Sequence, residues 1–167
     1  MSITVFTVGH SSHTAEYFAG LLQGQGVECL ADVRSQPASR FAPQFSRAGL
    51  EGGLAGAGIA YRWLGAALGG RPHDAAVYRA DGRVDYAARA LQPDFIAGIS
   101  ELLKLAADRP TVIMCAERDP LQCHRTHLVT PALLAQGVVV RHILADGSCI
   151  DHAALQQQTN RQPDLFD

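Results

Sequence analysis

The sequence predicts a single α/β domain with a mainly parallel sheet, helices on both faces and three layers. Short β-rich runs alternate with segments of helical periodicity, which is the pattern of successive β-α-β units. A length of 167 residues is that of one domain, and a hydrophobic fraction of 47% is ample for its core. We expect residues 1–155 to form the domain and residues 156–167 to form a flexible polar tail.

The opening third of the chain has the pattern strand, helix, strand. Residues 3–8 are rich in β-formers. The helix that follows has Thr14 as its expected N-cap, and Gly24 and Gly26 mark its end. A second strand is expected over residues 27–33. Such a unit implies parallel strands joined by a right-handed crossover.

The middle of the chain is interrupted by a long loop. We expect a weak helix within residues 46–58, a short strand over residues 59–64 and a functional loop over residues 65–85. The clearest helix begins near Pro93, and its apolar residues repeat at helical spacing through about Ala107.

Two further strands are expected over residues 111–115 and 138–143, with a helix between them. Pro131 lies inside this helix and has no N–H to donate to the carbonyl of His127. We therefore expect a kink or a break there.

Composition limits the classes of partner. The net charge is −2, so a nucleic acid would have to be bound by a local basic patch. All basic residues except Lys104 are arginines, which suit phosphate and carboxylate groups, although a GC-rich genome produces the same bias. No apolar run approaches a membrane span, and no signal peptide is recognisable, so we expect a cytoplasmic protein without a membrane partner. The four cysteines are then expected to be thiols (Cys29, Cys115, Cys123 and Cys149).

Polar residues gather where the predicted strands end. The first strand runs into His10 and the second into Asp32 and Arg34, while the strand over residues 111–115 runs into Glu117. Because ligands bind beyond the carboxyl ends of parallel strands, these loops should share one crevice. His10, Arg34, Glu117 and Arg125 should therefore lie at the same end of the sheet.

Cys123 is the strongest candidate nucleophile. It is expected at a helix N-terminus beside His124 and Arg125, and all three features favour a thiolate. Glu117, His10 and His124 are the candidate acid-base groups, while Arg34, Arg40 and Arg125 would suit an anion. Simpler roles remain open, since Asp32 and Arg34 would also make a structural ion pair, and Cys115 a core residue.

A zinc site is the alternative for the cysteines. Its ligands would be Cys115, Cys123, His124 and His127. This spacing is not one of the usual structural patterns, so we predict no metal, and no cofactor is indicated.

Several ordered motifs resemble the domain-of-unknown-function 488 family. The resemblance extends from about residue 5 to residue 147 and rests on TVGHS (7–11), ADVRSQPASRFAPQF (31–45), GIAYRWLG (58–65), LGGR (68–71), MCAERDPLQCHR (114–125) and GVVVRHI (137–143). It implies a fold and a site, but no reaction. The polar positions it implies are His10, Ser11, Asp32, Arg34, Ser39, Arg40, Tyr61, Cys115, Glu117, Cys123, His124 and Arg125. Arg71, which follows a longer spacing than in the family, is added as a candidate ligand-binding residue.

A partial resemblance to rhodanese-like sulfurtransferases rests on an Asp-Val-Arg after an early strand and a cysteine at the end of a later one. In those proteins the cysteine loop closes on an arginine within a few residues. Here Cys115 and Arg125 are ten positions apart, so sulfur transfer is the alternative function.

The C-terminus resembles the bacterial sliding-clamp-binding peptide through Gln162, Leu165 and Phe166. Leucine and phenylalanine would fill an apolar pocket while the glutamine sets the register. A chance match is the alternative, since such patterns are short.

Three functional hypotheses follow. The first is an enzyme acting on a nucleotide or nucleic acid, in the context of DNA maintenance, with a sliding clamp as partner. The second is a non-catalytic module that binds a phosphate group or nucleic acid. The third is a thiol-dependent sulfurtransferase.

Overall fold

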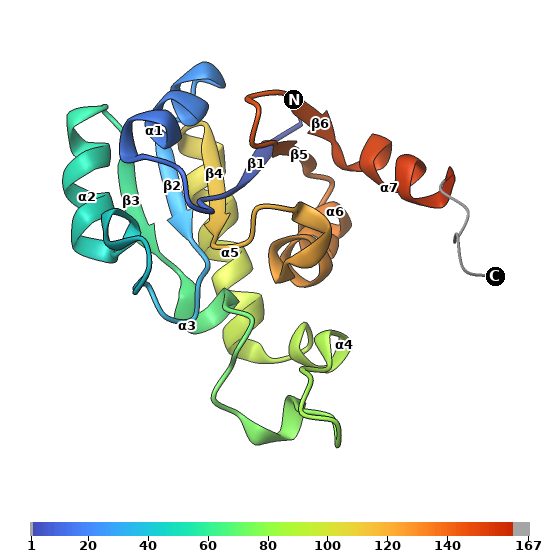
Figure 1. The fold of residues 1–167 in the computed structure, drawn as a ribbon. Coiled ribbons are helices and arrows are strands. Elements are labelled where there is room, and N and C mark those ends of the chain that lie inside the picture. The colour runs from blue at the N-terminus through green and yellow to red at the C-terminus, as the bar shows by residue number, and fades with distance from the viewer. Residues whose placement is uncertain (1, 162–167) are drawn as a thin grey trace.

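The computed structural model describes residues 2–161, which form one six-stranded sheet covered by helices (Figure 1). The strand order is β3-β2-β4-β1-β5-β6, and all neighbours are parallel except β5 and β6. The predicted mainly parallel sheet is therefore confirmed. The strands are β1 (Thr4–Gly9), β2 (Cys29–Asp32), β3 (Ala60–Trp63), β4 (Thr111–Cys115), β5 (Val139–Ile143) and β6 (Cys149–Asp151).

The helices lie on both faces of the sheet and complete an α/β fold. They are α1 (Ala15–Gly24), α2 (Arg47–Gly56), α3 (Gly65–Leu68), α4 (Tyr86–Arg89), α5 (Pro93–Asp108), α6 (Thr130–Ala135) and α7 (His152–Arg161). Helices α1 and α2 cover one face, and α3, α5 and α6 cover the other (Figure 1). Within residues 2–161, no helix combines the length and the apolar character that crossing a membrane requires.

The strands β1, β2, β4 and β5 contribute side chains to two cores, because successive side chains point to opposite faces of the sheet. Leu30 packs with Phe18 of α1 and Leu50 of α2, whereas its neighbour Ala31 packs with Phe95 of α5. The two central strands β1 and β4 are buried over most of their length, as expected for a parallel sheet covered on both sides.

The break expected at Pro131 is present. A π-helical turn spans Arg125–Val129, and α6 starts directly after it with Pro131 in its first turn. A proline is tolerated there because the first N–H groups of a helix have no partner within the helix. The irregular turn fixes the position of Arg125, whose carbonyl accepts a hydrogen bond from the Thr130 hydroxyl at 2.6 Å.

Four elements are absent from the sequence prediction. Helices α3 and α4 have four residues each, too few to give a periodic signal. Strand β6 has three residues, too few to give a periodic signal. Helix α7 extends to Arg161, across the first part of the stretch expected as a tail, and it is anchored by the buried side chains of His152 and Leu155. The clamp-binding residues Gln162, Leu165 and Phe166 lie outside the described residues.

The loops after β1 and β4 meet at a glycine. A Cβ atom on Gly9 would lie 1.7 Å from the carbonyl oxygen of Glu117. The His10 N–H also donates to the Cys115 carbonyl at 2.9 Å, which continues the pairing of β1 with β4 beyond the strands. Only a residue without a side chain allows this close approach.

We expect Gly9→Ala to lower the free energy of unfolding by about 3 kcal/mol, because the new methyl group can be accommodated only by displacing the backbone of Glu117. Gly52→Ala is the matched control, since Gly52 lies within α2 and its added Cβ would meet no atom within 4 Å. The control should be more stable than the wild type by about 0.5–1 kcal/mol. Urea denaturation measures both changes, and a shift of the same sign in the two variants would contradict the proposed contact.

Candidate active site

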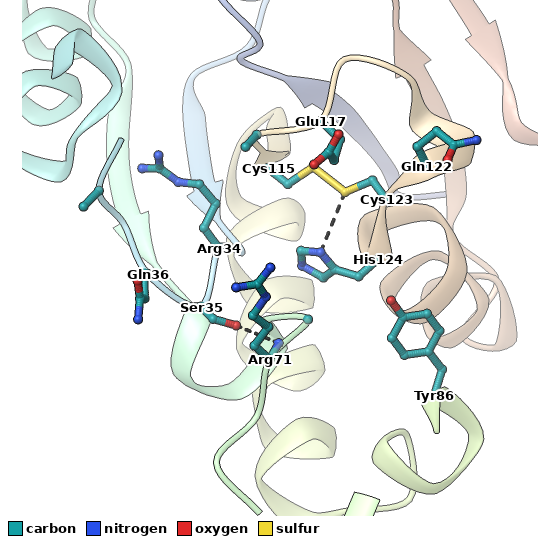
Figure 2. A pocket seen from close by; sticks show the side chains of 13 residues that line it. Arg34, Ser35, Gln36, Arg71, Tyr86, Cys115, Glu117, Gln122, Cys123 and His124 are labelled. Atoms are coloured by element: carbon teal, nitrogen blue, oxygen red, sulfur yellow. Dashed lines mark hydrogen bonds between the residues drawn. A yellow bond between two sulfur atoms is a disulfide. The ribbon is translucent and has the colours of Figure 1, made fainter. Parts of the chain in front are cut away.

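A cavity of about 420 Å³ opens beyond the carboxyl ends of β2 and β4 (Figure 2). Its walls come from the segments that follow these strands, from the loop after α3 and from the first residue of α4. The lining residues are Arg34, Ser35, Gln36, Ala38, Gly70, Arg71, Tyr86, Cys115, Ala116, Glu117, Gln122, Cys123 and His124.

Cys115 and Cys123 lie side by side against this cavity. Their Sγ atoms are in contact and are drawn as a disulfide in Figure 2. Both residues are almost fully buried, at 2% and 3% exposure. The Cα atoms are 7.5 Å apart, beyond the span of roughly 4.4–6.8 Å that most disulfides bridge, so the backbone also accommodates two separate thiols. The sequence analysis treated all four cysteines as thiols, whereas here only Cys29 and Cys149 are free.

Arg125 lies beneath the two sulfur atoms and is completely buried. Its Nη1 donates to the Sγ of Cys115 and to the Glu117 carbonyl, both at 2.8 Å. Burial lowers the pKa of Arg125 to about 10, so the group remains charged at neutral pH. When the pair is reduced, this charge favours the thiolate of Cys115.

His124 is placed as a base for the second sulfur. Its Nε2 lies 2.8 Å from the Val33 carbonyl oxygen, which only accepts, so Nε2 carries the proton of the neutral ring. Burial lowers the pKa of His124, which keeps the ring neutral. Its unprotonated Nδ1 then lies 3.7 Å from the Sγ of Cys123, as the dashed line in Figure 2 marks. The reduced Cys123 thiol can therefore pass its proton to His124.

A buried chain of hydrogen bonds runs from Arg125 to α7. Arg125 Nε donates to the Thr7 hydroxyl at 3.2 Å, and that hydroxyl lies 2.7 Å from Nδ1 of His142. His142 Nε2 lies 3.0 Å from Nδ1 of His152. The hydroxyl has one hydrogen and two acceptor positions, so the tautomers of the two rings decide which group donates in these last two bonds. Burial lowers the pKa of His142 to about 3, so this arrangement has neutral rings.

Asp32 and Arg34 form a two-point ion pair behind the cavity wall, with contacts of 2.9 and 2.8 Å. The Tyr61 hydroxyl donates to the same carboxylate at 2.6 Å, which raises the pKa of Tyr61 together with its burial. Arg34 Nη1 also donates to His10 Nε2 at 3.3 Å, and the His10 ring stacks on Phe45. This is the structural arrangement that the sequence analysis left open. Arg34 lines the cavity, but its charge is balanced.

The remaining predicted residues divide between the cavity and its surroundings. Glu117 and Arg71 line the cavity, and both are exposed. Ser11 adopts a positive φ of 47° and donates its N–H to the Ala116 carbonyl. The Ser39 hydroxyl accepts from the Ala42 N–H at 3.1 Å, and Arg40 is exposed on the same loop. None of these three loop residues (Ser11, Ser39 and Arg40) lines the cavity. The same is true of His10, Asp32 and Tyr61.

Four polar lining residues were not predicted: Ser35, Gln36, Tyr86 and Gln122. Ser35 accepts a hydrogen bond from the Arg71 N–H at 2.8 Å and so ties the loop after α3 to the end of β2. Because Ser35 directly follows Arg34 in the sequence, it could have been predicted as a site residue. Tyr86 gave no signal, because it follows the irregular loop whose path the sequence does not specify.

The four candidate zinc ligands do not converge. His127 Nε2 lies 2.6 Å from the Leu121 carbonyl, while His124 is directed at Val33 and Cys123. Within residues 2–161, no group of three or more potential ligands is arranged to hold a metal ion.

A family model described as "Domain of unknown function DUF488" matches residues 14–131, well over half of the chain. The matched range includes every residue that lines the cavity, but it begins after His10 and Ser11. Comparison with curated proteins and with solved structures finds no match.

The hydrogen-bonded histidines predict a pH dependence of stability. In the unfolded chain a histidine has a pKa near 6.5, whereas that of folded His142 is about 3. As the pH falls through this window, the unfolded chain gains a proton that the folded protein does not. We expect a loss of up to about 1.4 kcal/mol of unfolding free energy per pH unit from His142.

His142→Gln should make this decline shallower in denaturation experiments between about pH 7 and pH 4. His73→Gln, a change at an exposed histidine, should retain the wild-type slope. Identical slopes in the two variants would show that His142 is not held in its neutral form.

Proposed function

This chain belongs to the family described as Domain of unknown function DUF488, and from its own site we propose that it is a thiol-dependent enzyme that transfers sulfur through Cys115 and Cys123. The supporting observation is the contact between the two sulfur atoms, each of which has an activating partner of its own. Arg125 contacts Cys115, and His124 faces Cys123. Both cysteines line a cavity that opens to solvent.

The contact between Arg125 and Cys115 removes the main objection to sulfur transfer. Ten positions separate the two residues in the sequence, yet the guanidinium reaches the sulfur at 2.8 Å because the chain returns through Cys123 after a short 3₁₀ turn at residues 120–122. A thiolate stabilised in this way is suited to attack an electrophilic sulfur atom.

The proposed reaction has two steps. The Cys115 thiolate attacks the outer sulfur of a persulfide or thiosulfate donor, the sulfur–sulfur bond of the donor breaks, and the donor leaves as a thiolate or as sulfite. Cys115 then carries a persulfide. His124 removes the proton of Cys123, whose thiolate attacks the Sγ of Cys115, forms the disulfide and releases hydrosulfide. An external dithiol returns the pair to its reduced state.

The cavity favours an anionic donor. Arg71 lines it and makes no salt bridge within the described residues, whereas Arg34 is paired with Asp32, and Arg125 is buried beneath the sulfurs. Arg71 would therefore bind the negative group of the donor. Glu117 is exposed beside the sulfur atoms in Figure 2.

A second candidate is the enzyme that acts directly on a phosphate group of a nucleotide or nucleic acid. The guanidinium of Arg71, which makes no salt bridge within residues 2–161, favours it, since arginine binds phosphate by two parallel hydrogen bonds. Cys123 would then be the nucleophile, and Cys115 would not be needed. The context of DNA maintenance depends on the clamp-binding residues of the C-terminus, which the structure does not describe.

We expect thiosulfate to modify the cysteines of the reduced protein differently in three variants. In Cys123→Ser the reaction should stop at the first step, and intact mass should increase by one sulfur atom located on Cys115. Cys115→Ser should gain no sulfur. Turnover with a dithiol should fall by roughly 100-fold or more in both variants.

Cys149→Ser is the control, because it removes a partly buried cysteine that lies away from the cavity. It should retain wild-type turnover. Sulfur added to Cys123 rather than Cys115, or to neither, would contradict the proposed order of attack.

A further inference from the structure

A second cavity, of about 700 Å³, adjoins the thiol cavity. It is lined by Gly70, Arg71, Tyr78, Arg79, Gly82, Arg83, Val84, Tyr86 and Ala87. We propose that the two cavities form one groove that binds single-stranded nucleic acid. This inference rests on the proposed function in one respect, since the groove would bring its ligand to the thiol pair.

The two cavities adjoin each other because they share a wall. Gly70, Arg71 and Tyr86 line both of them. Figure 2 shows the Arg71 guanidinium and the Tyr86 hydroxyl extending toward the thiol side of this wall. A Cβ on Gly70 would lie 3.0 Å from the ring of His124, so the shared wall passes close to the base that serves Cys123.

The second cavity carries a local excess of positive charge. Arg71, Arg79 and Arg83 line it, and none of its lining residues is acidic. Arg79 is 3.9 Å from Asp85, the outer limit of an ion pair, and the side chain of Arg83 has no salt bridge within residues 2–161. The lining of this cavity thus offers three guanidinium groups to a phosphate backbone, with Asp81 and Asp85 on the same segment outside the lining.

Aromatic rings alternate with these arginines. The Tyr78 hydroxyl donates to the Pro72 carbonyl at 2.7 Å, which fixes its ring while leaving the residue 36% exposed. Phe41 lines neither cavity, but it lies on the loop whose Ala38 lines the thiol cavity, where it is 96% exposed and follows the exposed Arg40. Burial in the domain does not account for such a phenylalanine, whereas stacking on an unpaired base would cover it.

Rings and guanidinium groups together favour nucleic acid over an acidic peptide. A carboxylate-rich peptide would use the arginines but would leave Tyr78 and Phe41 unused. Unpaired bases stack on aromatic side chains while the backbone phosphates bind arginine, which is the usual mode of single-strand binding. A duplex would keep its bases away from these rings.

The test is the binding of a fluorescent oligothymidylate of about ten nucleotides, measured by anisotropy at several salt concentrations. We expect the double variant Arg79→Gln, Arg83→Gln to bind about tenfold more weakly than the wild type at low salt. The slope of log affinity against log salt should fall by about 1.4, which corresponds to two lost phosphate contacts on a single strand. Arg109→Gln is the control, since Arg109 lies 44% exposed before the amino end of β4.

Several outcomes would contradict the proposed groove. The wild type and the double variant could bind the oligonucleotide with equal affinity. A mononucleotide, or an acidic peptide of the same charge, could compete as effectively as the unlabelled oligonucleotide. Phe41→Ala should also weaken binding by severalfold. The double variant should still accept sulfur from thiosulfate, because neither Arg79 nor Arg83 lines the thiol cavity. Failure of the groove is therefore distinguishable from failure of the thiol chemistry.

Discussion

The hydrogen bonds of the buried Arg125 guanidinium join three parts of the chain that meet only at the carboxyl ends of the strands. They reach the Thr7 hydroxyl of β1, the Cys115 sulfur at the end of β4 and the Glu117 carbonyl of the following loop. Within residues 2–161, no carboxylate forms an ion pair with this charge. Burying a charge in this way is costly unless its donors are used. Nε and Nη1 have these partners, whereas Nη2 has none within residues 2–161, so the acceptors around Nε and Nη1 fix the position of the arginine beside the Cys115 sulfur.

The rest of the site depends on this arrangement. Arg125 contacts the Cys115 sulfur and Arg34 is paired with Asp32, so we propose that Arg71, which also lines the thiol cavity, binds the anion. A site made of two thiols and one anion-binding group therefore describes this cavity better than a cluster of arginines around a phosphate does. This is the reason for preferring sulfur chemistry, and for placing phosphate recognition in the adjoining cavity.

Much of the fold and part of the site follow from the sequence. The parallel β-α-β pattern, the break near Pro131 and the meeting of loops beyond the strands arise from local periodicity and backbone chemistry, which a sequence displays directly. The partner of Cys123 could not be predicted, because its contact with Cys115 depends on how the loop between them folds back. The same limit applies to Tyr86, which a long irregular loop brings to the cavity. His10 does not line the cavity, but it accepts a hydrogen bond from Arg34, which does, and its ring stacks on Phe45.

The most direct test of the account is the oxidation of the reduced protein by one equivalent of diamide, followed by peptide mapping without reduction. The account predicts an intramolecular disulfide between Cys115 and Cys123, with Cys29 and Cys149 remaining as thiols whose pKa values are raised by burial. The bond should form rapidly at neutral pH, since the sulfur atoms are already in contact and one is stabilised as a thiolate. A disulfide that involves Cys149, or four thiols that remain unpaired, would contradict the account.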